Sequence, residues 1–392
     1  MPITLAQALA ALPSTPGAQA PGLDIAAAEG LIAAASAWPS PTVRVATNRY
    51  TARFVVGASM PLPIFGTVGA AKRVATAEAS VIRAEATLAQ RELRNRVIVA
   101  WIALARADAD LESSRIVAAQ AVELARIAQG KLDAGTGIEV DVTLAAAARA
   151  RADIAARRAL ELTEATSAEL AGLLGWDPTN LLRAEGLPVA GEAATLAAWR
   201  ARLSEHPERV AARGRVTVAE ANVDLILKSR WPTIAIEGQV AFHDPTLTDP
   251  TTNQLLGPDA SIGLALDLPI FARIGARAKS ARVSVAAQRD RLAATESRLA
   301  GALVAAFERW DAATSQLQAL STEVLPLQQK ASAQLEQAYR EGTKDLSVVI
   351  LAERDLAGVR AEVNAARADA AVAYAELELA AGETSPAQGA AR

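Results

Sequence analysis

The chain has 392 residues, of which 51% are hydrophobic and only 4% aromatic, and its formal net charge is -3. The near-neutral charge gives no overall attraction to nucleic acid or anionic lipid, and the small side chains favour closely packed helices over a bulky globular core. The absence of cysteine excludes disulfides, thiolate metal sites and cysteine nucleophiles.

The first residues lack the features of an export signal. Met1 is followed directly by Pro2, Ile3 and Thr4, without a charged and apolar leader. No run approaches the ~18 apolar residues that a transmembrane helix needs. If the protein is exported, we expect its signal peptide to be absent from this sequence, so a membrane interpretation must rest on strands.

The sequence contains two copies of one plan. The segment from Thr4 to Leu12 matches the segment that begins at Thr195, at an offset of 195 - 4 = 191. The motif Leu-Pro-Ile-Phe occurs at 62–65 and again at 268–271, at the larger offset of 268 - 62 = 206. The second copy therefore carries an insertion. It falls at 244–258, a stretch rich in Asp, Pro, Thr and Asn that is typical of a loop.

Each copy is expected to form a β-hairpin, a very long helix, a glycine turn and a returning helix. In the first repeat, 1–190, these are expected at about 41–62 (hairpin), 66–134 (long helix) and 138–174 (return helix). In the second repeat, 191–382, they are expected at about 232–268, 273–341 and 345–381. Residues 383–392 are expected to be a disordered tail.

The second long helix has the clearest periodic pattern. Its apolar positions step alternately by three and four, as in a coiled-coil seam. They are Leu303, Ala306, Trp310, Ala313, Leu317, Leu320, Val324, Leu327 and Ala331. A helix of roughly 65 residues would be about 100 Å long at ~1.5 Å per residue. We expect Pro326 to kink it locally.

The hairpins alternate between apolar residues and small or polar ones. The predicted apolar face of the second hairpin consists of Ile234, Ile236, Val240, Phe242, Ile262, Leu264 and Leu266. Alternation over ~10 residues is typical of a transmembrane barrel strand with its apolar face toward lipid, although a small sheet packed on a helical domain would alternate as well. Trp38 and Trp231, each just before a hairpin, suit a membrane interface.

Four strands cannot close a barrel, and open strand edges are not tolerated in lipid. A membrane location therefore requires oligomerisation. Two chains would give 2 × 4 = 8 strands and three would give 3 × 4 = 12.

The order, duplication and spacing of these motifs resemble the outer-membrane efflux proteins of the TolC type. The resemblance rests on Leu-Pro-Ile-Phe-x-x-x-Gly after each hairpin, on Gly-Thr turns about seventy residues later, and on the repeat start at His206-Pro207-Glu208. It covers nearly the whole chain. It implies a mainly α fold with a β-barrel part, assembled as a homotrimeric α-barrel/β-barrel tunnel with 12 strands in the barrel.

The resemblance also implies a function. The protein would be the outer-membrane channel of a tripartite efflux pump in a Gram-negative bacterium, with its helices in the periplasm. Its partners would be a periplasmic adaptor protein, an inner-membrane efflux transporter and outer-membrane lipid, and it would need no cofactor or metal. Residues 244–258 would form an extracellular loop. The short first hairpin loop, 47–53, is similar to the branch that serves heavy-metal pumps.

By themselves the glycine turns predict helix C-caps; the resemblance places them at the periplasmic tip. Expected adaptor contacts are Gly135, Thr136, Gly137, Gly342 and Thr343. Expected gate residues are Asp141, Lys344, Glu139 and Asp345, of which Asp141 and Lys344 would form a salt bridge of ~0–1 kcal/mol if exposed. Val348 and Leu351 stand where the family's best-studied pattern has acidic residues. An apolar ring there would gate by dewetting.

Two other functional classes are alternatives. A soluble coiled-coil scaffold would use the long helices to dimerise, but it has no need for four alternating strands of lipid-spanning length. An enzyme would need converging catalytic groups, and the sequence has no cysteine, no Gly-rich phosphate loop and no serine elbow. The two histidines, His206 and His243, do not have the spacing of a metal site.

Overall fold

The computed structural model describes residues 1–48, 52–188, 191, 194–243, 248, 257–269 and 273–382. The predicted tail, 383–392, and most of the predicted loop, 244–258, lie outside the described residues. The chain forms two compact units: a helical unit (Met1–Pro21, Thr87–Pro207 and Glu296–Arg392) and a sheet unit (Gly22–Ala86 and Glu208–Thr295). Each unit takes segments from both repeats, so the units do not coincide with 1–190 and 191–382.

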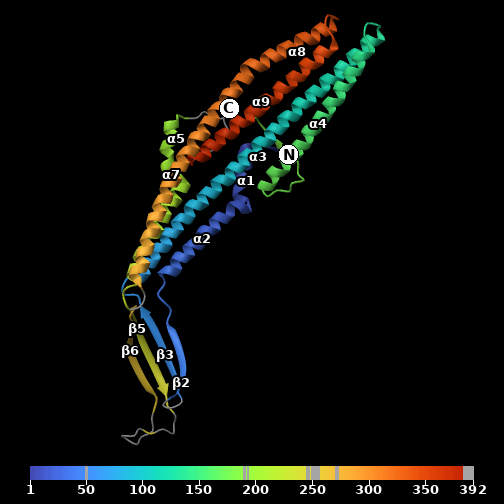
Figure 1. The fold of residues 1–392 in the computed structure, drawn as a ribbon. Coiled ribbons are helices and arrows are strands. Elements are labelled where there is room, and N and C mark those ends of the chain that lie inside the picture. The colour runs from blue at the N-terminus through green and yellow to red at the C-terminus, as the bar shows by residue number, and fades with distance from the viewer. Residues whose placement is uncertain are drawn as a thin grey trace. The chain divides into compact units, whose positions relative to one another are not determined.

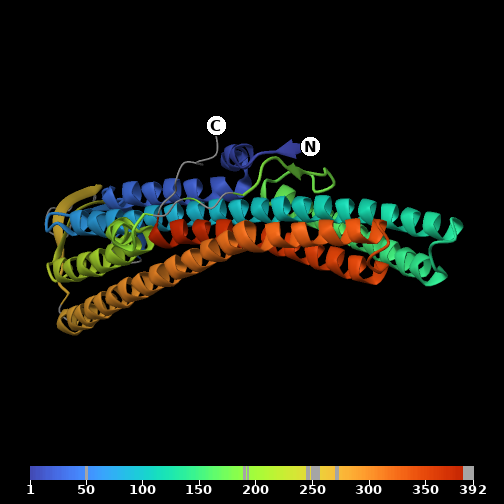
Figure 2. The ribbon, with the colours of Figure 1, turned by 90° about the horizontal axis from the view of Figure 1, so that it is seen from above.

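The helical unit contains most of the long helices (Figures 1 and 2). Its helices are α1 (Leu5–Ala11), most of α3 (Thr67–Asp133), α4 (Glu139–Leu173), α5 (Leu196–Arg202), the end of α7 (Ile274–Ala319), α8 (Leu325–Arg340) and α9 (Leu346–Ala381). Short 3-10 helices lie at Leu12–Ser14 and Leu203–Glu205, and β1 (Pro2–Ile3) pairs in parallel with β4 (Arg183–Ala184).

The main core of the helical unit surrounds Trp101, near the middle of α3. The Trp101 indole N–H donates to the Ile3 carbonyl at 3.0 Å. Leu104, Leu170 and Leu182 are buried in the same cluster. This core fixes β1, β4 and the end of α4 against α3.

The second long helix is interrupted. α7 ends at Ala319, a π-helical turn spans Leu320–Val324, and α8 begins at Leu325. Pro326 lies in the first turn of α8. Because its ring clashes with the carbonyl four residues earlier and it has no N–H to donate, the turn before it widens. The expected kink at Pro326 is therefore a break that begins upstream of the proline.

The break changes which face of the helix is buried. Leu303 and Ala306, before it, are buried, whereas Val324 and Leu327 are exposed, Leu327 by 69%. Further along, Tyr339 is buried instead. A π turn contains one extra residue and so rotates the side chains that follow. The prediction that the coiled-coil seam continues through Val324 and Leu327 is wrong for this reason.

The sheet unit is built on one four-stranded antiparallel sheet (Figure 1). Its strands are β2 (Thr42–Asn48), β3 (Ala52–Leu62), β5 (Thr233–Phe242) and β6 (Asp259–Asp267), in the order β2-β3-β5-β6. The central pair, β3 and β5, joins the two repeats, with Leu62 opposite Ile234 and Phe54 opposite Phe242. On the outer side of β2 and of β6, no described strand is paired.

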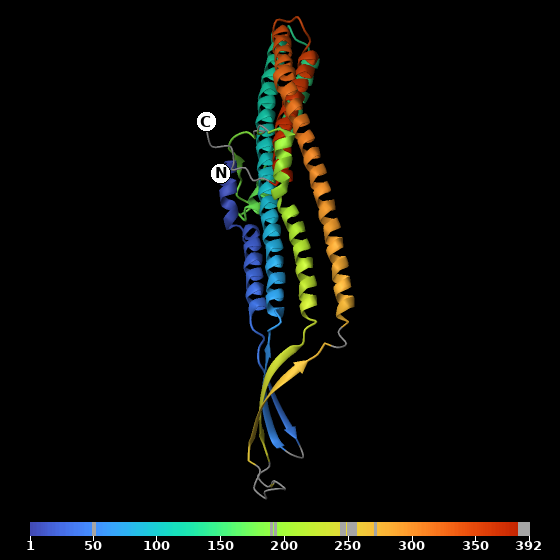
Figure 3. The same ribbon diagram turned by 90° about the vertical axis from the view of Figure 1, so that its left-hand side faces the viewer.

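Helical segments continue from the sheet within the same unit (Figure 3). They are most of α2 (Pro16–Ser36), α6 (Pro207–Lys228) and the first turns of α3 and α7. A Cβ on Gly214 of α6 would lie 2.7 Å from Cγ2 of Val81 on α3. Val81, Ala84 and Ala211 form a small buried cluster at this contact. Small side chains thus permit the close helix packing that the composition predicts.

Candidate functional site

Two glycine turns lie at the same end of the helical unit (Figure 2). Gly135 follows α3 and Gly342 follows α8, with φ of +70° and +78°, a conformation that glycine adopts at little cost. The Thr136 amide donates to the Lys131 carbonyl at 2.9 Å, and Thr343 makes the equivalent bond at 2.8 Å. Both turns are Schellman motifs, so the prediction of two helix C-caps is confirmed.

The two turns have different residues at the position two after the left-handed glycine. A Cβ on Gly137 would lie 2.8 Å from the Leu132 backbone nitrogen. The Gly137 amide also donates to the Lys131 carbonyl at 2.9 Å. The corresponding residue of the second repeat is Lys344, whose side chain is exposed. The first turn is therefore folded tightly against the end of α3, and only the second turn has a side chain at this position.

A buried cluster joins the two turns. It takes residues from α3, α4, α8 and α9, namely Leu124, Ala128, Ala145, Tyr339, Leu346 and Val349. The pair α3 and α4 belongs to the first repeat and the pair α8 and α9 to the second. The cluster therefore holds the tips of the two helical hairpins together.

Lys131 and Tyr339 make a polar contact between the same tips. The Lys131 ammonium lies 4.1 Å from the centre of the Tyr339 ring and donates to the Tyr339 backbone carbonyl. This places a cation at the C-terminal end of α8, where the helix dipole favours positive charge. Neither residue was predicted from the sequence, although each lies in the last turn before its glycine and so could have been suspected of facing the other tip.

Tyr339 is almost completely buried, with 3% of its surface exposed. Its hydroxyl has no hydrogen-bond partner among the described residues. Burial raises the pKa of Tyr339, and the negative charge of Asp141 raises it further. The phenol of Tyr339 therefore stays protonated at neutral pH. The carboxylate of Asp141 lies close enough to disfavour its ionisation.

The predicted gate residues lie at the two turns without pairing. Asp141 is half-buried in the first turn of α4, and Glu139, Lys344 and Asp345 are exposed. Among the ion pairs of the described residues, none joins Asp141 to Lys344. Their salt bridge stays a prediction.

Apolar side chains are exposed beside both turns. Ile138 and Val140 are each 61% exposed, and Val348 and Leu351 are exposed beyond the second turn. The predicted adaptor-contact residues are exposed at Gly135, Thr136, Gly342 and Thr343 and half-buried at Gly137. Aliphatic side chains gathered on a surface in this way are typical of a protein contact.

In the sheet unit, strand pairing brings the predicted apolar residues onto one face. Residues directly opposite each other in an antiparallel pair share a face, and Ile236 is opposite Leu264. The full set on this face is Ile234, Ile236, Val240, Phe242, Ile262, Leu264 and Leu266. β2 adds Val43 and Val45. The face is open: Ile262 is 87% and Leu264 75% exposed.

The opposite face of the sheet is polar and hollow. A cavity of about 300 Å³ lies over it. Its polar lining comes from Thr42, Arg44, Ser59, Glu237, Gln239 and Ser261. The sheet thus separates an exposed apolar surface from a polar recess.

The histidines do not lie together. His206 is buried against Gly382, and Nε2 of His243 lies 3.6 Å from Asp259 Oδ2. In the described part of the chain, no group of three or more His, Cys, Asp or Glu side chains could hold a metal ion. No described helix is long and apolar enough to cross a membrane.

The second repeat matches a known protein family. Residues 200–383, which include β5, β6 and α7 to α9, match the sequence pattern of the family described as outer membrane efflux protein. The match covers 383 - 200 + 1 = 184 of the 392 residues and shows a likeness of the second repeat to this family. The chain is also similar to outer membrane efflux protein BepC of Brucella suis biovar 1 (strain 1330), to which it is 27% identical over 261 residues. The alignment covers 65% of this chain but only 56% of BepC.

Solved structures of outer-membrane proteins have the same fold. VceC of Vibrio cholerae superposes with a TM-score of 0.77 at 16% identity, over 97% of this chain and 96% of VceC. CusC superposes with a TM-score of 0.81 at 15% identity, over 97% of this chain and 92% of CusC. The open state of MtrE of Neisseria gonorrhoeae superposes with a TM-score of 0.78 at 17% identity, over 97% of this chain and 89% of MtrE. At these identities the likeness shows the fold alone.

Proposed function

We propose that this protein is the outer-membrane channel of a tripartite efflux pump. It would conduct substrate passively from an inner-membrane transporter and a periplasmic adaptor protein to the exterior. The observation that carries the proposal is the sheet, which has an exposed apolar face and a polar, hollow one. Such a sheet fits a barrel wall between lipid and a wet lumen. The likeness of residues 200–383 to the outer membrane efflux protein family supports the same function.

The sheet edges support assembly into a trimer. Because open edges are not tolerated in lipid, β2 of one chain would pair with β6 of the next. Three chains of four strands would close a barrel of 3 × 4 = 12 strands. We propose a homotrimer in the outer membrane of a Gram-negative bacterium, with the helices in the periplasm and residues 244–258 outside the cell.

The glycine turns would form the periplasmic tip. The exposed Ile138 and Val140 support a protein contact there, which we assign to the adaptor. Asp141 and Lys344 are proposed as the gate, together with Glu139 and Asp345. Since Asp141 and Lys344 are not paired within the chain, their bond would form between neighbouring chains of the trimer. No catalytic role is proposed.

The first hairpin suggests a class of substrate to test. The loop that resembles the heavy-metal branch was predicted at 47–53. β2 ends at Asn48 and β3 begins at Ala52, and residues 49–51 between them lie outside the described residues. We propose heavy-metal ions as the first cargo to examine. A gene deletion should then lower growth on copper, zinc or cobalt salts. Unchanged tolerance of all three would contradict this part of the proposal.

The channel itself is tested by the oligomeric mass of detergent-extracted protein and by single-channel conductance in a planar bilayer. A trimer that opens pores is expected. Asp141→Ala or Lys344→Ala should raise the open probability. Asp153→Ala and Lys330→Ala, which change exposed charges elsewhere on α4 and α8, serve as controls and should not. A water-soluble dimer without conductance would support the coiled-coil scaffold instead.

A further inference from the structure

The first turns of α7 carry more positive charge than the matching turns of α3. The start of α7, over 274–289, contains Arg277, Lys279, Arg282 and Arg289 and no acidic residue, a net charge of +4. The equally long start of α3, over 67–82, contains Lys72, Arg73 and Glu78, a net charge of 2 - 1 = +1. The first sixteen residues of α7 therefore carry 4 - 1 = 3 more positive charges than those of α3, and the difference falls to one when Asp290 and Arg83 are included.

This charge is placed where a helix by itself disfavours it. The N-terminal end of a helix carries a partial positive charge, so cations there are destabilising unless an anion is near. α7 has no acidic residue in its first turn. Arg273, just before the helix, adds a further cation that the helix dipole disfavours.

Arg273 is also held in an unusual backbone conformation. Its φ is +45°, in the left-handed region, whereas the residue just before α3 is Gly66, with φ of +75°. A left-handed residue with a side chain is strained relative to glycine. The second repeat therefore has an arginine side chain where the first repeat has a glycine.

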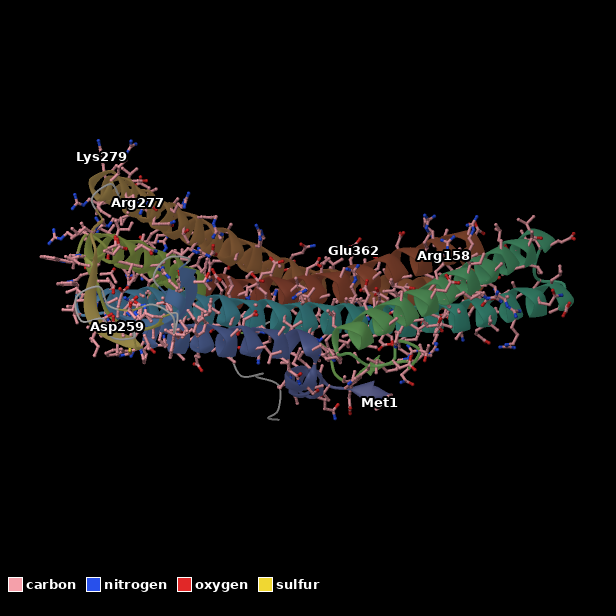
Figure 4. All side chains as sticks on the ribbon, turned by 90° about the horizontal axis from the view of Figure 1, so that it is seen from below. Met1, Arg158, Asp259, Arg277, Lys279 and Glu362 are labelled. Atoms are coloured by element: carbon pink, nitrogen blue, oxygen red, sulfur yellow. The ribbon has the colours of Figure 1, made fainter. Side chains whose placement is uncertain are left out.

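Four cations at the start of α7 are unpaired among the described residues. None of them forms an ion pair with Arg273, Arg277, Lys279 or Arg282. Carboxylates on the neighbouring helices hold other arginines: Asp224 pairs with Arg73, Glu220 with Arg289, Glu29 with Arg83 and Glu85 with Arg215. Figure 4 shows Arg277 and Lys279 at this end of α7, projecting away from the helix.

The cations also lie next to the features expected at a membrane surface. The apolar strand β6 ends at Asp267, shortly before Arg273 in the chain. In the same unit, Phe65 and Trp231 stack with ring centres 5.5 Å apart, and aromatic side chains concentrate at membrane interfaces. Arg273 and Arg282 are about 14 Å apart along the helix at ~1.5 Å per residue. The four cations therefore span about two and a half helical turns at the start of α7.

Resting on the membrane location proposed above, we propose that Arg273, Arg277, Lys279 and Arg282 form a binding surface for the phosphate groups of anionic phospholipids. The lipids would be those of the leaflet on the helical side of the barrel. Clusters of four or more Lys and Arg beside a membrane-spanning segment bind such headgroups electrostatically. We call this surface the α7 basic collar.

The test is a comparison of lipid binding by the full chain. Detergent-purified protein is titrated with phosphatidylglycerol or phosphatidylcholine, and bound lipid is counted by native mass spectrometry. The wild type should prefer phosphatidylglycerol. The triple variant Arg277→Gln, Lys279→Gln, Arg282→Gln should lose that preference, with affinity falling on the order of a hundredfold at low salt. The matched control, Arg151→Gln, Arg157→Gln, Arg158→Gln, removes three exposed arginines of α4 and should behave as wild type.

Four outcomes would overturn the collar. Equal losses in both triple variants would show that only total charge matters. A wild type that inserts into vesicles but binds both lipids equally would defeat the collar and leave the channel standing, whereas a wild type that does not insert at all would defeat both. A collar variant whose trimer falls apart in lipid-free detergent, while the control stays trimeric, would show that the cations pair with carboxylates of a neighbouring chain.

Discussion

At the scale of single residues, the first glycine turn depends on Gly137 for space. Its Cβ position lies 2.8 Å from the Leu132 nitrogen, closer than real side chains approach backbone. We expect Gly137→Ala to lower the free energy of unfolding by about 1–3 kcal/mol, because the turn must open to admit the methyl group. Thermal and denaturant unfolding measure this change.

Gly130→Ala is the matched control for this substitution. Gly130 is exposed in the last turns of α3, the helix that precedes the turn, and a Cβ there would meet nothing within 4 Å. It should stabilise the protein by about 0.5–1 kcal/mol, since alanine is the better helix former. If both variants changed stability in the same direction, Gly137 would not be sterically restricted.

Tyr339 gives a second prediction at this scale. Because burial and the charge of Asp141 raise its pKa, its ionisation, followed by ultraviolet absorbance, should come at higher pH than that of an exposed tyrosine. Asp141→Asn removes the second cause and should move the transition to lower pH. Tyr339→Phe should abolish it.

The sign of the linked stability follows from the same shift. A raised folded pKa means that the buried phenol contributes stability below its ordinary pKa near 10 and that this contribution is lost as pH rises through the folded value. The wild type should therefore lose stability more steeply than Tyr339→Phe above about pH 10. Parallel losses in the two proteins would show that the ring is not buried as described.

At the scale of elements, the π turn separates two parts of one helix that look alike in sequence. Leu303→Ala, at a buried site, should cost about 2–5 kcal/mol. Leu327→Ala, at a site of the same predicted seam that is 69% exposed, should change stability by less than about 0.5 kcal/mol. Denaturant midpoints of the two variants measure the contrast, and similar losses would mean that the seam runs on through the break.

These elements also show what sequence can and cannot predict. The observed ends of α3 (Thr67–Asp133) and α9 (Leu346–Ala381) lie within one residue of the predicted 66–134 and 345–381, because left-handed glycines stop helices by a local rule. The π turn was not predicted. One extra residue in a turn does not change the amino-acid composition, and Pro326 predicts a break in the helix without giving the position where it begins. Strand faces were predictable from alternation, but the β3–β5 pairing came only from the fold.

At the two glycine turns, too, some residues could be predicted from the sequence and others could not. Asp141 and Lys344 were found by resemblance to a family, whereas the contact of Lys131 with Tyr339 depends on two helices from different repeats ending side by side. Sequence patterns are local along the chain, and this contact spans 339 - 131 = 208 residues. Only the three-dimensional arrangement could assign it.

At the scale of the whole molecule, the two faces of the sheet predict opposite responses to the same substitution. Leu264→Arg places a charge on the exposed apolar face and should reduce the yield of membrane-inserted trimer, since arginine facing lipid costs about 2–4 kcal/mol near the bilayer midplane. Ser261→Arg, on the polar face, should insert normally and shift conductance toward anions. Equal insertion of both would contradict a lipid-facing sheet.

The position of β3 between the repeats has a consequence for how the chain is made. β3 ends at Leu62, whereas its pairing partner β5 begins only at Thr233. At a synthesis rate of about 5–20 residues per second, β3 waits roughly 10–30 s before β5 exists. For that time its edge can pair with any other strand, and such long-range pairing is slow even when both strands are present. Until the second repeat has been made, the edge of β3 that faces β5 is therefore open to pairing with another strand.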